Sequence, residues 1–328
     1  MNEPMENNHE RRENVQLDEI MRLLFDMSKE TLVNMLNGLF NEKFNPDFVD
    51  IIKDNAKFVN EQLEIIEGDL FLRVTKSHAR PYLFHIEFQT GEDKTMAIRV
   101  LRYDLSKANE NQYLNGNNNE IILYMPQSLV IHIEAHENIP NEYRAVIVFA
   151  DGDTKEFKVP VLKYWELSDE YLIKHNLFPL LPLKIFLLRA ELDKLTKNND
   201  VRAKQAAILK ARDTAEKIAK EAAELNNSGR LIDEDFKKVL IAIANLFIHL
   251  NNRYKVDESI NEGVKTVLVE LDFSEANKNR IAVERGKREK AVETAKEMLS
   301  DGEPINKIKK YTKLTENEIK EIQKSFKD

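Results

Sequence analysis

Cysteine is absent from the 328 residues of the chain. Disulfides, thiolate zinc sites, iron–sulfur clusters and cysteine nucleophiles are therefore excluded, and any metal must bind to oxygen or imidazole ligands. Glycine and proline are scarce, with nine of each. Together with 42% apolar and 32% charged residues, this composition favours an ordered, helix-rich protein over a low-complexity one.

Long apolar runs are missing as well. Residues 1–16 are polar and lack the apolar core of a signal peptide, and no later stretch approaches the roughly 18 apolar residues that a membrane span requires. We therefore expect no membrane segment and a cytoplasmic location. The 49 Lys and Arg against 57 Asp and Glu give a net charge of −8, which argues against a protein that holds nucleic acid by a broad basic surface alone.

The length of the chain favours more than one domain. We expect residues 1–16 to be disordered and residues 17–165 to form an α/β core, because helices, strands, a helix and further strands follow one another there. Beyond Trp165 the strand pattern ends, and Pro179 and Pro182 mark the boundary. Residues 166–290 are predicted to be a helical region, and residues 291–328 a small C-terminal helical unit.

Hydrophobic periodicity predicts the individual elements. A three- to four-residue spacing of apolar positions predicts helices over 17–25, 31–40, 94–110, 180–195, 201–225, 233–250 and 260–271. Strand character predicts strands over 63–66, 69–74, 82–88, 128–134, 143–150 and 155–162. Asp151-Gly152-Asp153 is typical of a tight hairpin turn.

A polar row lies on the predicted strand 82–88 and its end. Strand side chains alternate, so His85, Glu87 and Gln89 share one face while the residues between them form an apolar face. A hairpin through the loop 76–81 can bring Asp69 of the preceding strand opposite Glu87, and we expect the two carboxylates to face a wet cleft. Hard cations such as Mg²⁺ are commonly held by one or two carboxylates with phosphate oxygens and water, so this pair is a candidate metal site.

Three runs around these residues resemble a known family: Gly68-Asp69, Tyr82-Leu83-Phe84-His85-Ile86-Glu87-Phe88-Gln89 and Met96-Ala97-Ile98-Arg99-Val100-Leu101-Arg102-Tyr103. They look like the recombination-promoting nuclease (Rpn) family, often labelled as transposases, which belongs to the PD-(D/E)XK nuclease superfamily. The resemblance implies a restriction-endonuclease-like core, a mixed sheet flanked by helices. It also implies Mg²⁺-dependent cleavage of double-stranded DNA, with Asp69 and Glu87 as metal ligands; Mn²⁺ is expected to substitute for Mg²⁺.

Two positions depart from the superfamily motif. Gly68 replaces a proline that has no chemical role. Gln89 replaces a lysine, so a neutral hydrogen-bonding group stands where a positive charge is usual. We interpret Gln89 as a catalytic residue that positions water or phosphate. The missing cation is expected from Arg99, or from Arg73 or Lys94.

Two further residues are candidates for this site. Tyr103 shares a helical face with Arg99 and is either a positioning residue or a half-buried core aromatic. Glu64 is a candidate additional metal ligand, although an acid in a strand is more often an edge or solvent-facing residue.

The C-terminal segment carries three short apolar stripes. The first contains Ala291 and Ala295, the second Ile305, Ile308 and Tyr311, and the third follows a capping box at Thr315-x-x-Glu318. From residue 275 to 328 there are 14 Lys and Arg against 11 Asp and Glu, a local net charge of +3. The segment is either a helix-turn-helix-like DNA reader or a helical cap or dimerisation element.

These observations favour a Mg²⁺-dependent DNA endonuclease in which metal-activated water attacks the phosphodiester. A homodimer is expected, because two symmetric sites could cut both strands of a duplex. Two rival hypotheses stay open. One is a non-catalytic DNA-binding protein with a degenerate nuclease core, and the other is a protein-interaction scaffold built on the long helices.

Overall fold

The structure is a computed structural model. It describes residues 20–21, 23–54, 57–59, 65–67, 70–76, 80–111, 113–115, 120–198, 200–254, 288 and 290–324. The predictions for Glu64, Asp69 and the helix 260–271 lie outside the described residues, as do residues 17–19 and 22 of the predicted helix 17–25.

A six-stranded mixed sheet forms the centre of the fold, in the order β1-β4-β5-β8-β10-β9. Its strands are β1 (Val49–Lys53), β4 (Leu70–Lys76), β5 (Tyr82–Gln89), β8 (Gln127–His132), β9 (Glu142–Val148) and β10 (Thr154–Lys163). Pairing is antiparallel from β1 to β4 and from β4 to β5, parallel from β5 to β8 and from β8 to β10, and antiparallel again between β10 and β9. Strand β5, which carries the polar row, is therefore an inner strand.

Small elements complete the strand-rich part. Two further pairs of short strands are β2 (Lys57–Val59) with β3 (Ile65–Glu67) and β6 (Tyr113–Asn115) with β7 (Glu120–Ile122). The predicted Asp151-Gly152-Asp153 turn is confirmed, because the Phe149 amide donates to the Asp153 carbonyl at 2.8 Å and Gly152 has a φ of 92°. Glycine adopts this left-handed conformation without a steric penalty.

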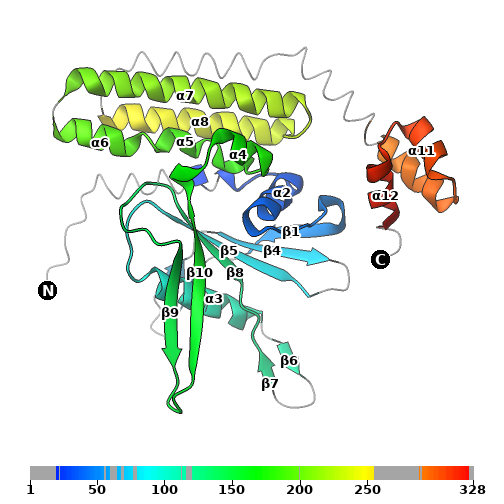
Figure 1. The fold of residues 1–328 in the computed structure, drawn as a ribbon, viewed down its shortest axis with the longest axis horizontal. Coiled ribbons are helices and arrows are strands. Elements are labelled where there is room, and N and C mark those ends of the chain that lie inside the picture. Colours follow the sequence, from blue (N-terminus) through cyan, green and yellow to red (C-terminus); the bar gives the residue numbers. More distant parts are fainter. Residues whose placement is uncertain are drawn as a thin grey trace.

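The two faces of the sheet pack against different layers. Helix α3 (Met96–Glu110) covers one face, and its Met96 and Val100 form a small apolar cluster with Val130 and Val159. The other face, with Phe84 among its buried side chains, packs against α2 (Lys29–Phe40) and the later helices. Figure 1 shows the sheet between α3 and this helical layer. The polar row of β5 therefore points towards α3.

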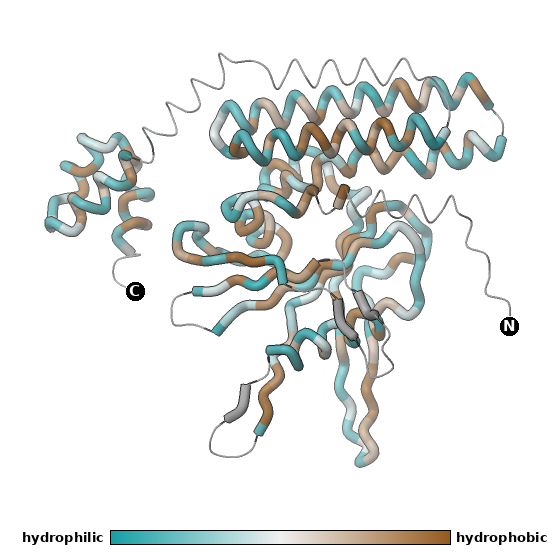
Figure 2. The backbone as a smooth tube through the Cα atoms, turned by 180° about the vertical axis from the view of Figure 1, so that it is seen from behind, coloured by the Kyte–Doolittle hydropathy of each residue, from teal (hydrophilic) through white to brown (hydrophobic). Residues whose placement is uncertain are grey.

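The helical layer continues the core of the sheet. Its elements are the short 3-10 helices η1 (Pro46–Phe48), η2 (Tyr164–Glu166) and η3 (Phe178–Leu180) and the α-helices α4 (Asp169–Lys174), α5 (Leu183–Phe186), α6 (Arg189–Lys197), α7 (Val201–Asn227) and α8 (Asp233–Tyr254). One continuous apolar cluster joins Phe84 and Ile86 of the sheet to Ile218 and Leu246 of α7 and α8. Apolar and hydrophilic stretches alternate along these two helices in Figure 2, as expected of helices that bury one face.

Helix α2 fits tightly into this layer at Gly38. A Cβ atom at Gly38 would lie 2.1 Å from the carbonyl oxygen of His175, at the end of α4. This close approach of two backbones requires glycine.

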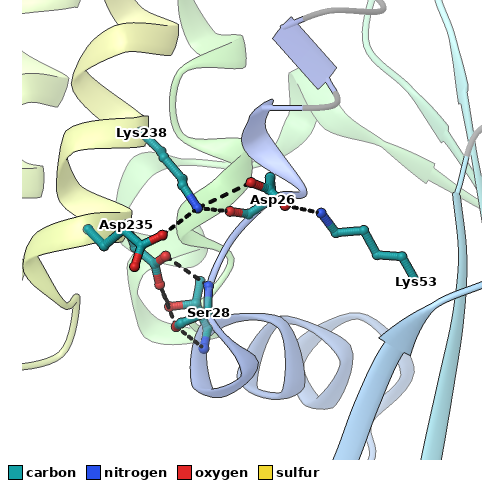
Figure 3. Close-up of polar contacts among 7 residues, drawn as sticks. Asp26, Ser28, Lys53, Asp235 and Lys238 are labelled. Carbon is teal, nitrogen blue, oxygen red and sulfur yellow. Dashed lines mark hydrogen bonds and ion pairs between the residues drawn. The ribbon is translucent and has the colours of Figure 1, made fainter.

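A buried carboxylate connects α8 to the start of α2 (Figure 3). Asp235 has no exposed surface, and it accepts hydrogen bonds from the Ser28 amide at 2.8 Å, the Ser28 hydroxyl at 2.5 Å and the Thr31 hydroxyl at 2.6 Å. An anion at a helix N-terminus also interacts favourably with the helix dipole. Beside it, Asp26 accepts from Lys53 of β1 at 2.6 Å and pairs with Lys238 of α8 at 3.3 Å. Polar contacts thus hold the sheet, α2 and α8 together at one corner.

The C-terminal unit has its own core. Helical residues 290–300, α11 (Ile305–Thr312) and α12 (Glu316–Lys324) bury Ala295, Ile308, Leu314 and Ile319 against one another. The predicted capping box is confirmed, because Glu318 accepts from the Thr315 amide at 2.6 Å and Thr315 accepts from the Glu318 amide at 3.3 Å. The assignment of Tyr311 to the apolar stripe is wrong.

Tyr311 is 64% exposed, whereas Thr312 is buried. The reason is that the inward face of α11 repeats at Ile305, Ile308 and Thr312, so that Tyr311 falls on the flank of the helix.

The α/β expectation is confirmed as a mixed six-stranded sheet with flanking helices, followed by a helical C-terminal region. In the described part of the chain, no helix is both long and apolar enough to cross a membrane.

Candidate active site on the polar face of the sheet

The polar row of β5 forms as the alternation predicts. His85 and Glu87 are buried on the α3 side, and Gln89 follows them at the end of the strand. The neighbouring strand contributes Phe71, whose ring stacks on His85 with centroids 4.1 Å apart. Tyr103 of α3 also contacts the imidazole, edge-on, with ring centroids 5.9 Å apart.

Glu87 is the centre of this row, and it is 2% exposed. Arg99 Nη2 lies 3.3 Å from one of its carboxylate oxygens, and His85 Nε2 lies 3.4 Å from the other. The expectation that Glu87 faces a wet cleft is therefore wrong. Burial of a carboxylate is costly unless cations and hydrogen bonds compensate it, and here two cationic groups lie against it.

Arg99 connects three groups at the open end of the row. Its guanidinium lies near Glu87. With the Gln89 amide turned so that its oxygen faces Arg99, the guanidinium also donates to that oxygen. Asp93 pairs with it at 3.2 Å and also accepts from the Thr95 amide at 2.7 Å. The Arg99 side chain is 32% exposed, so it is not fully enclosed.

His85 lies between two acids. Asp104 Oδ1 is 2.7 Å from His85 Nδ1, and Ser128 donates to the other oxygen of Asp104 at 2.6 Å. Burial lowers the pKa of His85, but the hydrogen bonds to Asp104 and Glu87 outweigh it and raise the pKa to about 9. At neutral pH the imidazole is therefore protonated and holds the two carboxylates in place.

A second ion-pair cluster occupies the neighbouring part of the same layer. Arg73 Nε donates to Asp54 at 2.9 Å, and the buried Lys107 lies 3.3 Å from the same carboxylate and 2.8 Å from Glu110. Arg73 is thus paired away from Glu87. Lys94 is exposed in the turn before α3. Of the cations considered for the site, Arg99 is the one that the structure brings to Glu87 and Gln89.

The sequence predictions did not include Asp104 or Ser128. Asp104 and Lys107 follow Met96 and Val100 at helical spacing, and all four side chains are buried. This spacing could have identified them, because a charged residue on the apolar face of a helix is buried and needs a buried partner.

The donors at this site fit Mg²⁺ in type. Glu87 supplies a carboxylate and Gln89 an amide oxygen, both hard ligands. Within the described residues, no group of three or more His, Asp or Glu side chains is arranged to hold a metal. Leu70, the first residue of β4, pairs with Ile86, directly before Glu87. The other candidate ligands from the sequence, Asp69 and Glu64, lie outside the described residues.

His132 occupies the equivalent end of the adjacent strand. It pairs in register with Gln89, is fully buried, and its Nε2 lies 2.8 Å from the Tyr143 hydroxyl. Burial, with a smaller contribution from His136, lowers the pKa of His132 to about 4. The imidazole is therefore neutral at pH 7, in contrast to His85.

This difference predicts an acid-sensitive stability. An imidazole whose folded pKa lies below its unfolded value of about 6.5 stabilises the fold above that pH. It loses this contribution as the pH falls from about 6.5 to about 4. The free energy of unfolding of the wild type should therefore decrease on acidification. In His132→Gln this decrease should be smaller by on the order of 2 kcal/mol, because the titrating imidazole is gone. Urea unfolding of both proteins at pH 7 and pH 4.5 measures the difference. If the free energy of unfolding decreases equally in both proteins, His132 is not the source of the acid sensitivity.

The chain matches no family model, and neither a curated protein nor a solved structure is detectably similar to it.

Proposed function

We propose that this protein is a Mg²⁺-dependent DNA endonuclease of the PD-(D/E)XK type that cleaves double-stranded DNA. The observation that supports the proposal most strongly is the meeting of Glu87, Gln89 and Arg99. An acid and an amide on one face of an inner strand share a single arginine from the helix that crosses that face. The motif resemblance assigns catalytic roles to this acid and amide.

The roles follow from the chemistry of each group. Glu87 acts as a carboxylate ligand for the metal, and bound Mg²⁺ supplies the positive charge that polarises the phosphodiester and activates water. Gln89 positions water or a phosphate oxygen. Arg99, whose planar guanidinium can bind phosphate through two hydrogen bonds, takes the place of the lysine that the motif lacks.

Asp69 is the proposed second ligand. It precedes Leu70 in the chain, and Leu70 pairs with Ile86 beside Glu87. Glu64 is retained as a candidate third acid. His85 and Asp104 are proposed as positioning residues, because the protonated imidazole holds Glu87 from the side opposite Arg99.

A homodimer would bring two such sites to the two strands of a duplex. The proposed nuclease core spans residues 17–165, but its apolar core continues into the helices beyond residue 165. The activity would suit recombination, transposition or defence against mobile DNA.

The proposal is tested with supercoiled plasmid and the full chain. Mg²⁺ or Mn²⁺ should convert the plasmid to nicked and linear forms, and EDTA should prevent this. Ca²⁺ should support binding of a DNA duplex without cleavage. Binding without Mg²⁺-dependent cleavage would favour the non-catalytic DNA-binding protein, and absence of both would favour the interaction scaffold.

Gln89 offers a graded test of the same site. We expect Gln89→Ala to lower the cleavage rate roughly 100-fold, about 2.7 kcal/mol, because it removes a preorganised polar group beside the reacting phosphate. Gln89→Lys should keep part of the activity, since it restores a charge at the motif position. Single-turnover plasmid cleavage measures both variants, and full activity of the alanine variant would remove Gln89 from the site.

A further inference from the structure

Helix α11 and the turn after it carry an unusual concentration of positive charge. From residue 305 to 315 the sequence holds Lys307, Lys309, Lys310 and Lys313 and no acidic residue. The whole chain, in contrast, has a net charge of −8. A local excess of this kind on an acidic protein creates an attractive field for anions at one place on the surface.

Three of these lysines form no close ion pair with a described acid. Within the described part of the C-terminal unit, Glu303 pairs with Lys307 at 2.6 Å, Glu316 with Lys320 at 2.5 Å and Glu318 with Arg288 at 2.8 Å. These three acids thus form their close ion pairs with Lys307, Lys320 and Arg288, and Glu316 has a weaker electrostatic interaction with Lys309. Lys309, Lys310 and Lys313 are exposed and form no ion pair with a described residue.

Lys313 also has an uncommon backbone conformation. It ends α11 with a φ of 59°, and its amide donates to the Lys309 carbonyl. Glycine is the residue that tolerates this conformation best, and a lysine there is disfavoured. Lys313 thus adds a positive charge at the C-terminal end of α11, at a position where glycine would fit the backbone better.

The exposed ring of Tyr311 lies beside these lysines, with Lys310 Nζ 6.0 Å from its centroid. Among the described residues of the C-terminal unit, it is the one large apolar side chain that is strongly exposed. A membrane-surface helix would present a broad apolar face, whereas the apolar residues of α11 are used in the core of the unit. A single tyrosine with a polar tip, next to a lysine, suits contacts to phosphate and sugar.

We propose that Lys309, Lys310 and Lys313, with Tyr311 beside them, form a binding surface for the phosphate backbone of a nucleic acid duplex. The choice of DNA over RNA rests on the proposed nuclease function. The surface lies in the C-terminal unit and shares no residue with the site around Glu87. Contacts made by lysine to phosphate carry no sequence information, so this surface contributes affinity for any duplex.

The test uses the full chain and a fluorescent 30-base-pair DNA duplex, with Ca²⁺ in place of Mg²⁺. The variant combines Lys309→Ala, Lys310→Ala and Lys313→Gly, and the glycine relieves backbone strain so that folding is preserved. The control combines Lys197→Ala, Lys220→Ala and Lys237→Ala, which removes the same charge from exposed lysines of the helical layer. Fluorescence anisotropy at several salt concentrations gives the affinity and its salt dependence.

We expect the variant to bind roughly 10- to 100-fold more weakly and its salt slope to fall by about 3, because each lost phosphate contact contributes about 0.9. The control should bind like the wild type. Equal affinity of variant and wild type would overturn the proposal. So would a change in molecular mass by light scattering with unchanged affinity, or a loss of binding to anionic lipid vesicles with DNA binding intact.

The two proposals can fail separately. If Glu87→Gln abolishes cleavage and still binds the duplex like the wild type, the active-site proposal stands whatever the lysine variant shows. If the lysine variant loses affinity but no protein cleaves DNA, the binding surface stands without the nuclease.

Discussion

Replacing Glu87 by glutamine is expected to lower plasmid cleavage at least about 1,000-fold, roughly 4 kcal/mol in the activation barrier. The amide keeps the shape of the side chain but loses the negative charge that binds Mg²⁺. Glutamine can still accept a hydrogen bond from Arg99 or His85, so the cost to folding should stay near 1–2 kcal/mol. Cleavage kinetics and urea unfolding of the same preparation measure the two effects.

Glu87→Ala should separate the structural from the chemical role of this residue. It leaves the protonated His85 without one of its two acids in a buried layer, so the free energy of unfolding should fall by about 3 kcal/mol.

The matched control is Glu134→Gln, because Glu134 is also a buried acid paired with an arginine, Arg189, at 2.9 Å. It should lose stability yet keep cleavage. Equal losses of cleavage in Glu87→Gln and Glu134→Gln would mean that Glu87 is a structural acid.

Asp235→Ala is expected to have the largest effect on stability. The substitution removes the acceptor of three buried hydrogen bonds, from the Ser28 amide, the Ser28 hydroxyl and the Thr31 hydroxyl. Because these donors are left without a partner at the start of α2, the free energy of unfolding should fall by about 4 kcal/mol. The melting temperature should then fall by roughly 10 °C.

Glu234→Ala is the control on the same turn of α8. Glu234 is exposed and pairs with Lys238 at the surface, and such a pair contributes at most about 1 kcal/mol. Unfolding is followed by circular dichroism and by the fluorescence of Trp165, the single tryptophan, at the junction of the sheet and the helices. The two signals should move together, because one apolar cluster spans both layers. Separate transitions, or a stable Asp235→Ala protein, would contradict this account of the core.

Local patterns predicted much of the fold. Alternation on residues 84–89 identified which side chains face the apolar core and which face α3. Helical spacing placed Arg99 and Tyr103 on one side of α3, and the structure puts both against the polar row. The Asp151-Gly152 turn and the Thr315–Glu318 capping box were predicted because each depends on a few neighbouring residues.

Long-range pairing could not be predicted in the same way. Nothing in the local sequence of Asp235 distinguishes it from the acids beside it, and its buried position depends on Ser28, 207 residues away. The burial of Glu87 likewise depends on Arg99 and His85 closing over it, which alternation alone does not specify. The insertion of β10 between β8 and β9 also required the three-dimensional structure.

Return of activity to metal-stripped protein is the most direct test of Glu87 as a ligand of a catalytic Mg²⁺ ion. The full chain is treated with EDTA, dialysed, and mixed with supercoiled plasmid while Mg²⁺ is added in steps, with Glu87→Gln treated identically. We expect the wild type to regain cleavage in proportion to metal binding, whereas Glu87→Gln should stay inactive at every Mg²⁺ concentration. Cleavage that persists without Mg²⁺, or that Glu87→Gln shows at the wild-type rate, would contradict this expectation.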